Sequence, residues 1–387
     1  MNSSALRVLH LIPDLYRGGA ERMALDMVRH LRRIDGVEVV LATLRDENGY
    51  GNEYPDIQPL VTHARVVPSL KGKWMIQTEH FEALLETFNP HVVHSHLYEA
   101  EWVAHVRPKP DIAYFTHCHD NMRQLRPLSL GDLASKRRWT EAYERAHLIK
   151  AYQKVPPTFL AISPDTQTYF QAVLPKEWNH RVVALDNAID VSRFLPFRAQ
   201  HQSQPFTLIN IGSFVAKKNQ RFLLDIAEAC LARNLDVRVE MYGAGPLHEE
   251  VRAEIERRHL TDKVVAPGQV PQVQQRLAGA QAYVHTATYE PFGLVILEAM
   301  ACGLPVLALD GQGNRKLHKQ GDNGWMFTSQ DPNAFADKIL ELSTQPDLWS
   351  HCSEGALATA QQFDFTPYTQ KLHELYLKAV REKGILR

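Results

Sequence analysis

Short apolar runs alternate with longer amphipathic segments along the whole chain. The runs are rich in β-branched residues and apolar on both faces, which is typical of parallel strands covered by helices on two sides. The predicted strands are 7–13, 37–44, 91–95, 112–117 and 158–162, then 206–212, 237–243, 264–268, 282–286 and 305–309. The predicted helices between the later strands include 220–232, 247–258, 295–301 and 333–342. The alternation predicts an α/β protein built from βαβ units.

A polar segment divides the two sets of strands. Residues 193–205 carry two prolines and no apolar periodicity, which predicts an exposed linker. We therefore expect two doubly wound parallel-sheet domains joined near 190–205, facing a central cleft at the carboxyl ends of their strands.

Composition and charge narrow the class of protein. The 387 residues are 44% apolar and 22% charged, which excludes a disordered chain. A net charge of −1 argues against a surface that grips nucleic acid, and we expect no such partner. The four cysteines lie far apart without a C-x-x-C pair, and the start of the chain lacks the features of a signal peptide. Both observations favour the cytoplasm.

One stretch departs from this neutral balance. Residues 123–154 hold eight Lys or Arg against three acids, with apolar and aromatic side chains interleaved. Such a face suits the inner face of an anionic membrane or a phosphate-bearing acceptor, and it is equally typical of an ordinary solvated helix.

Histidines gather at two neighbouring strand ends. His94, His96, His117 and His119 follow or end the strands at 91–95 and 112–117. Within each pair the side chains point the same way on an extended strand. Two interpretations fit: ligands of a metal ion, or polar groups that line a cleft. We predict the second, with no metal.

Glycine-containing turns follow several strands. Gly18 and Gly19 lie between the first strand and a helix, where the backbone can approach an anion and helix N–H groups are free to bind one. A tight turn without a ligand fits equally well. In the second half, Ser213 and Lys218 follow one strand and Gly243 follows the next, which places a lysine where it can reach a phosphate.

Two glutamates flank an apolar helix start. Glu290 precedes the loop that holds Phe292 and Gly293, and Glu298 lies inside the helix that begins near Leu294. A carboxylate in so apolar a helix requires a polar partner, either a salt bridge or ligand hydroxyls. The helix start offers N–H groups to a diphosphate.

Several motifs together resemble retaining family-4 glycosyltransferases with the GT-B fold. They are the E-x7-E spacing from Glu290 to Glu298, Gly18-Gly19-Ala20-Glu21, Asn187-Ala188-Ile189-Asp190, Lys218-Asn219 and Gly321-Asp322-Asn323-Gly324. They span nearly the whole chain in the family's order. The resemblance implies a GT-B fold with an acceptor-side domain at 1–190, a nucleotide-sugar domain at 191–367, and a helix at 368–387 that returns to the first domain.

The resemblance also implies roles for single residues. Lys218 would neutralise the donor diphosphate, Glu290 would contact the transferred sugar, and Glu298 would hold the ribose. His119 resembles the family's histidine at the donor sugar and acceptor. The predicted catalytic set is therefore His119, Lys218 and Glu290. The predicted donor site adds Gly18, Gly19, Ser213, Gly243, Phe292, Gly293, Leu294 and Glu298.

The chain departs from the family pattern at three positions. Ser213 stands where an Arg is frequent, Lys316 where an acid is common, and His285 lies in a segment that replaces the usual Pro-Ser. Arg315 or Lys316 is positioned in sequence to compensate for the missing Arg.

These observations predict a retaining glycosyltransferase of the hexosyltransferase type. It would move a sugar from a nucleoside-diphosphate sugar, a UDP-sugar by likeness, to a glycan or lipid-linked acceptor in polysaccharide, lipopolysaccharide or capsule synthesis. No cofactor is expected, and no two aspartates stand two residues apart to hold a metal. The alternatives are a UDP-sugar epimerase of the same architecture and a nucleotide-sugar-binding protein without transferase activity.

Overall fold

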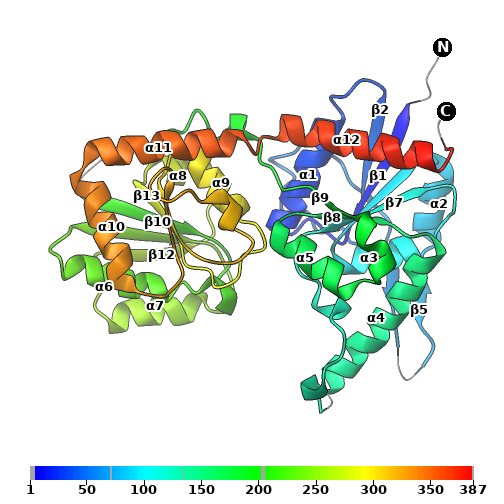
Figure 1. Ribbon diagram of the computed structural model, residues 1–387, viewed down its shortest axis with the longest axis horizontal. Coiled ribbons are helices and arrows are strands. Elements are labelled where there is room, and N and C mark those ends of the chain that lie inside the picture. Colours follow the sequence, from blue (N-terminus) through cyan, green and yellow to red (C-terminus); the bar gives the residue numbers. More distant parts are fainter. Residues whose placement is uncertain (1–4, 70–71, 133, 202–204, 386–387) are drawn as a thin grey trace. The chain divides into compact units, whose positions relative to one another are not determined.

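The computed structural model describes residues 5–69, 72–132, 134–201 and 205–385, which form two compact units (Figure 1). The N-terminal unit holds the described residues up to Asn187 together with those from Phe365 onward. The C-terminal unit runs from Ala188 to Asp364. The domain limits expected from the sequence lie three residues further along the chain at both crossings.

The N-terminal unit is built on a parallel sheet of seven strands in the order β3-β2-β1-β6-β7-β8-β9. Its strands are β1 (Leu6–Ile12), β2 (Val37–Thr43), β3 (Leu60–Val61), β6 (Val92–His96), β7 (Ala113–Cys118), β8 (Thr158–Ala161) and β9 (Val182–Ala184). A separate antiparallel pair joins β4 (Arg65–Val67) and β5 (Met75–Gln77). Its helices are α1 (Gly19–Leu31), α2 (Glu79–Phe88), α3 (Leu97–Val106), α4 (Lys136–Lys154), α5 (Pro164–Val173) and α12 (Phe365–Glu382).

The two faces of this sheet are filled differently. Leu9 and Leu11 of β1 point into an apolar cluster with Phe81 and Leu85 of α2. Since side chains alternate along a strand, His10 points to the opposite face. That face is covered by α12, which packs against α1 and β7. The sheet is thus apolar on one side and carries polar groups under α12 on the other.

The C-terminal unit is built on a second parallel sheet, in the order β12-β11-β10-β13-β14-β15. Its strands are β10 (Phe206–Ile211), β11 (Val237–Tyr242), β12 (Val264–Gly268), β13 (Ala282–His285), β14 (Val306–Leu309) and β15 (Gly324–Phe327). Its helices are α6 (Phe222–Leu231), α7 (His248–Arg257), α8 (Val273–Ala278), α9 (Leu294–Ala301), α10 (Pro332–Thr344) and α11 (Pro346–Gln361).

The strands and helices expected from the apolar pattern are confirmed, the strands to within one residue at each end. The exposed linker is confirmed only in part for residues 193–205, where Leu195, Pro196, Arg198 and Gln200 are exposed. Phe194 and Ala199 are only 5% and 7% exposed, and the Ala199 N–H donates to the Cys302 carbonyl at 2.8 Å. This segment is anchored to the C-terminal unit because Phe194 and Ala199 are buried there. Residues 202–204 of the expected linker lie outside the described ranges.

Candidate functional site

The C-terminal unit brings Lys218 and Glu290 together. Lys218 follows β10, and Glu290 follows the neighbouring strand β13, so both lie beyond the carboxyl ends of adjacent strands. The turn 216–218 ends at Asn219, which adopts a left-handed φ of 51° that asparagine tolerates better than most residues. The Lys218 Nζ lies 2.5 Å from Glu290 Oε2. Two of the predicted catalytic residues therefore form one ion pair.

His285 is the second partner of the Glu290 carboxylate. The His285 Nε2 lies 3.0 Å from Glu290 Oε2, and its Nδ1 lies 3.3 Å from the Tyr283 hydroxyl. Burial alone would raise the pKa of Glu290, but the Lys218 ammonium and His285 lower it below the usual range. Glu290 is thus a carboxylate at neutral pH, which can accept hydrogen bonds from hydroxyl groups.

Close backbone approach explains the glycine at 243. Gly243 has a φ of +143°, and a Cβ there would lie 2.0 Å from the Gly212 carbonyl oxygen. Glycine keeps the turn after β11 packed against the turn after β10, which carries Ser213 and Lys218. The Ser213 carbonyl accepts a hydrogen bond from Gln220 Nε2 at 3.0 Å.

The loop after β13 leads directly into α9. Gly293 caps this helix with a φ of 104°, and Leu294 is its first residue. The first N–H groups of a helix lack intrahelical partners and favour anions. The Phe292 side chain is buried against Phe363, with ring centroids 5.8 Å apart, so it offers a ligand only its backbone. Glu298, in α9, is 2% exposed.

The loop after β14 carries two cations, Arg315 and Lys316. Arg315 pairs with Asp310 at 2.8 Å, so compensation for the missing family Arg would require that pair to open. Lys316 is exposed.

Gly18, Gly19 and His119 belong to the N-terminal unit. Gly18 is the N-cap of α1, and the Tyr50 hydroxyl donates to its carbonyl at 2.8 Å. A Cβ at Gly18 would lie 2.3 Å from a carboxylate oxygen of Glu21. The Glu21 side chain therefore folds back over the start of α1.

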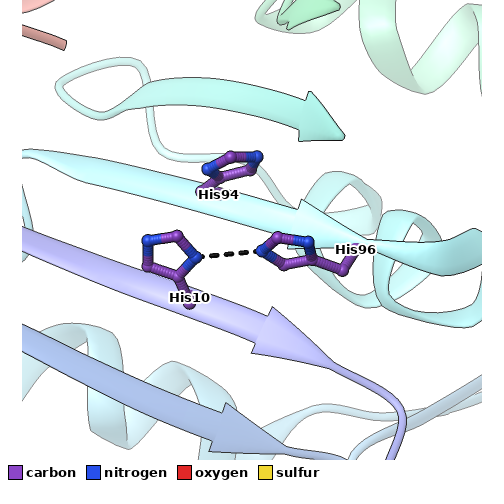
Figure 2. A group of neighbouring side chains, drawn as sticks. All are labelled: His10, His94 and His96. Carbon is purple, nitrogen blue, oxygen red and sulfur yellow. Dashed lines mark hydrogen bonds between the residues drawn. The ribbon is translucent and has the colours of Figure 1, made fainter. Parts of the chain in front are cut away.

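Five histidines cluster under α12 in this unit: His10, His94, His96, His117 and His119. The strand register pairs His10 with His94 and His96 with His117, so these side chains share one face of the sheet. His10 Nδ1 lies 2.9 Å from His96 Nε2, and Figure 2 draws this hydrogen bond as a dashed line. His96 Nδ1 lies 2.9 Å from His119 Nε2. Burial lowers the pKa of His10 to about 3 and that of His117 to about 4, and it lowers the pKa of His94, His96 and His119 well below the ordinary value.

Two groups of three histidines have the residue types of a metal site: His10, His94 and His96, and then His96, His117 and His119. A metal ion lies in the plane of each ligating imidazole, about 2.0–2.1 Å from its nitrogen for Zn²⁺. The His94 and His96 rings are instead stacked, with centroids 4.5 Å apart and planes 20° apart, so their lone pairs run side by side. His10 and His96 already face each other at hydrogen-bond distance. The rings as placed are arranged for hydrogen bonding to one another.

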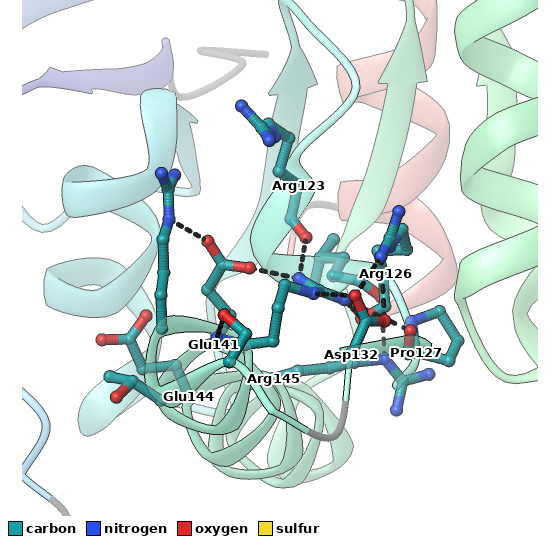
Figure 3. Close-up of polar contacts among 12 residues, drawn as sticks. Arg123, Arg126, Pro127, Asp132, Glu141, Glu144 and Arg145 are labelled. Carbon is teal, nitrogen blue, oxygen red and sulfur yellow. Dashed lines mark hydrogen bonds and ion pairs between the residues drawn. The ribbon is translucent and has the colours of Figure 1, made fainter. Parts of the chain in front are cut away.

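Among the described residues, three of the eight cations in the basic stretch 123–154 form ion pairs inside it, with two carboxylates as their partners. Asp132 accepts from Arg126 at 2.6 Å, and Glu141 accepts from Arg137 at 2.9 Å and also pairs with Arg138 (Figure 3). The exposed residues left on α4 include Lys136, Lys150 and Trp139, the last 48% exposed. Among the described residues, no helix combines the length and apolar character needed to cross a membrane.

Sequence reasoning missed His10 and Tyr376. His10 lies in the first strand without any motif, and its place beside His94 depends on a register that the sequence does not display. Tyr376 Oη lies 2.5 Å from His94 Nδ1 although 282 residues separate the two. The available signal was a lone polar residue on an otherwise apolar strand face.

Two parallel α/β units, one of which holds a Lys–Glu pair beside a helix start, define a GT-B-type transferase fold. The solved structure of HepE from Anabaena, in complex with UDP and glucose, has this fold. It superposes with a TM-score of 0.74 at 19% identity, over 96% of this chain and 99% of that one.

Models of two protein families match consecutive parts of the sequence. Glycosyltransferase Family 4 matches residues 17–193, and Glycosyl transferases group 1 matches residues 192–359. The chain belongs to the family-4 glycosyltransferases. The prediction is thereby confirmed for the family, the fold and the general class of enzyme.

Two curated relatives illustrate the range of the family. D-inositol 3-phosphate glycosyltransferase of Thermobispora bispora is 24% identical over 321 residues, which is 77% of this chain and 73% of the relative. N-acetyl-alpha-D-glucosaminyl L-malate synthase of Bacillus anthracis is 26% identical over 176 residues, 45% of this chain and 46% of the relative. The matched region thus spans about half the length of the second relative.

Proposed function

We propose that this protein transfers a sugar from a nucleoside-diphosphate sugar to a hydroxyl of a glycan or lipid-linked acceptor, with retention of the anomeric configuration and without a metal ion. A UDP-sugar is the proposed donor, supported by the UDP and glucose bound in HepE. Relatives that act on small hydroxylated acceptors support a hydroxyl as the acceptor group.

The observation that carries this proposal is the Lys218–Glu290 pair beside the start of α9. When the bond between the sugar and the diphosphate breaks, negative charge grows on the leaving phosphate. An ammonium group and helix N–H groups that are already in place stabilise this charge most strongly where it develops. The Lys218 ammonium is paired with the Glu290 carboxylate, so a phosphate would compete with that carboxylate for it.

Donor binding would exchange the partners of this pair. A phosphate oxygen takes Lys218 from Glu290, while His285 Nε2, 3.0 Å from the carboxylate, remains its partner. Glu290 then accepts hydrogen bonds from sugar hydroxyls, and Glu298 from the ribose. The acceptor oxygen bonds to the anomeric carbon, the bond to the diphosphate breaks, and the acceptor proton passes to the leaving phosphate.

A panel of sugar nucleotides tests the proposal. A donor that binds only the folded protein raises the melting temperature by mass action. With acceptor present, we expect a glycoside product whose anomeric configuration, read by NMR, matches the donor, and we expect turnover to survive EDTA. An epimerised sugar nucleotide formed from donor alone would identify an epimerase, and donor binding without turnover would identify a binding protein.

Lys218→Ala sharpens this test. Loss of a group that stabilises developing charge reduces turnover by about 10²-fold or more. The matched control is Lys217→Ala, because the Lys217 ammonium lies 5.5 Å from the centre of the Tyr289 ring rather than on Glu290. Equal rates in the two variants would remove Lys218 from the site.

The same proposal places the enzyme in the cytoplasm at the inner face of a membrane. The exposed Lys136, Trp139 and Lys150 of α4 are the proposed contact with anionic lipid. Flotation with anionic and with zwitterionic liposomes separates this contact from a purely solvated helix.

A further inference from the structure

A continuous chain of hydrogen-bonding groups connects α12 to His119 in the N-terminal unit. Tyr376 Oη lies 2.5 Å from His94 Nδ1 and 3.5 Å from His10 Nε2. From His10 the chain continues through His96 to His119, with 2.9 Å between the nitrogens at both steps. The four members before His119 are fully buried, whereas His119 is partly exposed.

The members of this chain are neutral, so the position of the proton on one member determines the positions of the protons on the others. Burial and the neighbouring imidazoles hold the pKa values of the histidines below the ordinary value. A neutral imidazole has one N–H and one bare nitrogen, so a ring that accepts on one nitrogen donates from the other. The direction of a single hydrogen bond therefore sets the direction of all of them.

The inner end of the chain favours one direction. His94 Nε2 is buried without a hydrogen-bond partner among the described residues. If the protons pointed toward His94, this nitrogen would carry an orphaned N–H, which is rarer and more costly in protein interiors than an orphaned acceptor. If they point toward His119, every N–H and O–H of the four fully buried members of the chain has an acceptor.

We propose that Tyr376, His10 and His96 are positioning residues that hold His119 in its Nδ1–H tautomer. In this arrangement His94 Nδ1–H donates to Tyr376, Tyr376 donates to His10 Nε2, His10 Nδ1–H donates to His96 Nε2, and His96 Nδ1–H donates to His119 Nε2. His119 then offers an N–H from Nδ1, which makes it a hydrogen-bond donor toward substrate rather than a base. This role toward substrate rests on the proposed function, whereas the tautomer does not.

The tautomer is directly measurable in the free protein. Long-range ¹H–¹⁵N correlation spectra of the ¹⁵N-histidine-labelled protein distinguish Nδ1–H from Nε2–H rings, and His119→Gln assigns the signals of His119. We expect Nδ1–H in the unmodified protein. Tyr376→Phe removes one hydroxyl from the chain and is expected to convert His119 into a mixture of tautomers.

Tyr368→Phe is the matched control for this substitution. Tyr368 is buried on the same helix, but its hydroxyl contacts Met27 Sδ at 3.4 Å and not the histidine chain. Its removal should leave the His119 signals unchanged. His10→Phe is the second variant, because it interrupts the chain from β1 and does not depend on α12.

Each outcome decides the inference. An Nε2–H or cationic His119 in the unmodified protein overturns it, as does an Nδ1–H signal that survives both Tyr376→Phe and His10→Phe. Stoichiometric Zn²⁺ in the purified protein, lost in His94→Gln, would replace the hydrogen-bonded chain with a metal site. If a donor and acceptor are found, Tyr376→Phe should lower kcat by roughly 10-fold with little change in donor KM. An inactive protein would refute the proposed function and leave the spectroscopic test intact.

Discussion

Both units bury polar groups at comparable points of their parallel sheets, but they stabilise these groups in opposite ways. Under α12 the N-terminal unit keeps its histidines neutral and relays hydrogen bonds among them. Beyond β10 and β13 the C-terminal unit keeps charge, with Lys218 against Glu290. A neutral network survives burial while each donor has an acceptor, whereas an ion pair survives only while both partners remain. The first arrangement suits orientation, and the second suits exchange with a charged ligand.

The largest expected effect is that a fall in pH destabilises the N-terminal unit more than the C-terminal unit. Below pH 6.5 the unfolded chain protonates its histidines, while His117 of the folded N-terminal unit resists protonation to about pH 4 and His10 to about pH 3. Folding stability therefore falls as the pH falls through this window, by about 1.4 kcal/mol per pH unit for each such histidine. The C-terminal unit has fewer groups of this kind: burial lowers the pKa of His318 to about 3 and lowers that of His285, while the lowered pKa of Glu290 costs stability only below its ordinary value of 4.5.

Hydrogen exchange at pH 7 and pH 5, corrected for intrinsic rates, measures this difference. We expect peptides from β1 and β6 to lose more protection than peptides from β10 and β13, because more buried neutral histidines lie in the N-terminal unit than in the C-terminal unit. Earlier loss in the C-terminal unit would contradict the neutral state of the histidines.

Removing one charge of the Lys218–Glu290 ion pair should cost more unfolding free energy than removing the Tyr376 hydroxyl from the neutral histidine chain. Lys218→Met leaves a buried carboxylate with His285 alone and is expected to cost about 3 kcal/mol of unfolding free energy. Adding Glu290→Gln should recover most of this loss, because no uncompensated charge remains. Tyr376→Phe should cost about 1 kcal/mol. Urea titrations at pH 7 measure all three, and a double variant no more stable than Lys218→Met would show that the pair does not govern stability.

Glu101 is a third kind of buried polar group, and its expected effect is smaller than that of Lys218→Met. Its Oε2 accepts from the Thr116 hydroxyl at 2.8 Å and the Tyr152 hydroxyl at 3.0 Å, and burial raises its pKa to about 8. Between its ordinary value of 4.5 and about 8 the unfolded chain is ionised while the folded chain keeps the proton. Stability should therefore fall as the pH rises, by about 2 kcal/mol from pH 6 to pH 8. Glu101→Gln should abolish this loss in urea titrations, and an unchanged slope would mean that Glu101 is ionised when folded.

Much of the fold follows from the apolar pattern, because buried parallel strands are apolar on both faces and stand out between amphipathic helices. Of the strands missed, β3, β4, β5 and β9 have two or three residues, which is too short for a pattern, whereas β15 has four residues, as have the predicted strands β13 and β14. The anchoring of residues 193–205 through Phe194 and Ala199 was not predicted, because two buried apolar residues suffice to anchor a segment without any periodicity.

The site was predictable where one segment or one motif defines it. Glu290, Gly293 and Glu298 belong to a single loop and helix, and Lys218 follows the strand beside it. The histidine chain was not predictable in full, because it combines β1, β6 and α12 through a register and a packing contact. Likewise, the surplus of positive charge in 123–154 did not reveal that Asp132 and Glu141 each bind two arginines.

The separation of His94 and Tyr376 by 282 residues in the sequence has a consequence for synthesis on the ribosome. The strands of the N-terminal unit emerge first, but the helix that covers their polar face is translated only after the whole C-terminal unit. We expect the imidazoles to remain in contact with water until then, which would leave their pKa values closer to the ordinary value. Packing of α12 is thus the step that excludes water from the polar face of the N-terminal sheet and makes its histidines neutral.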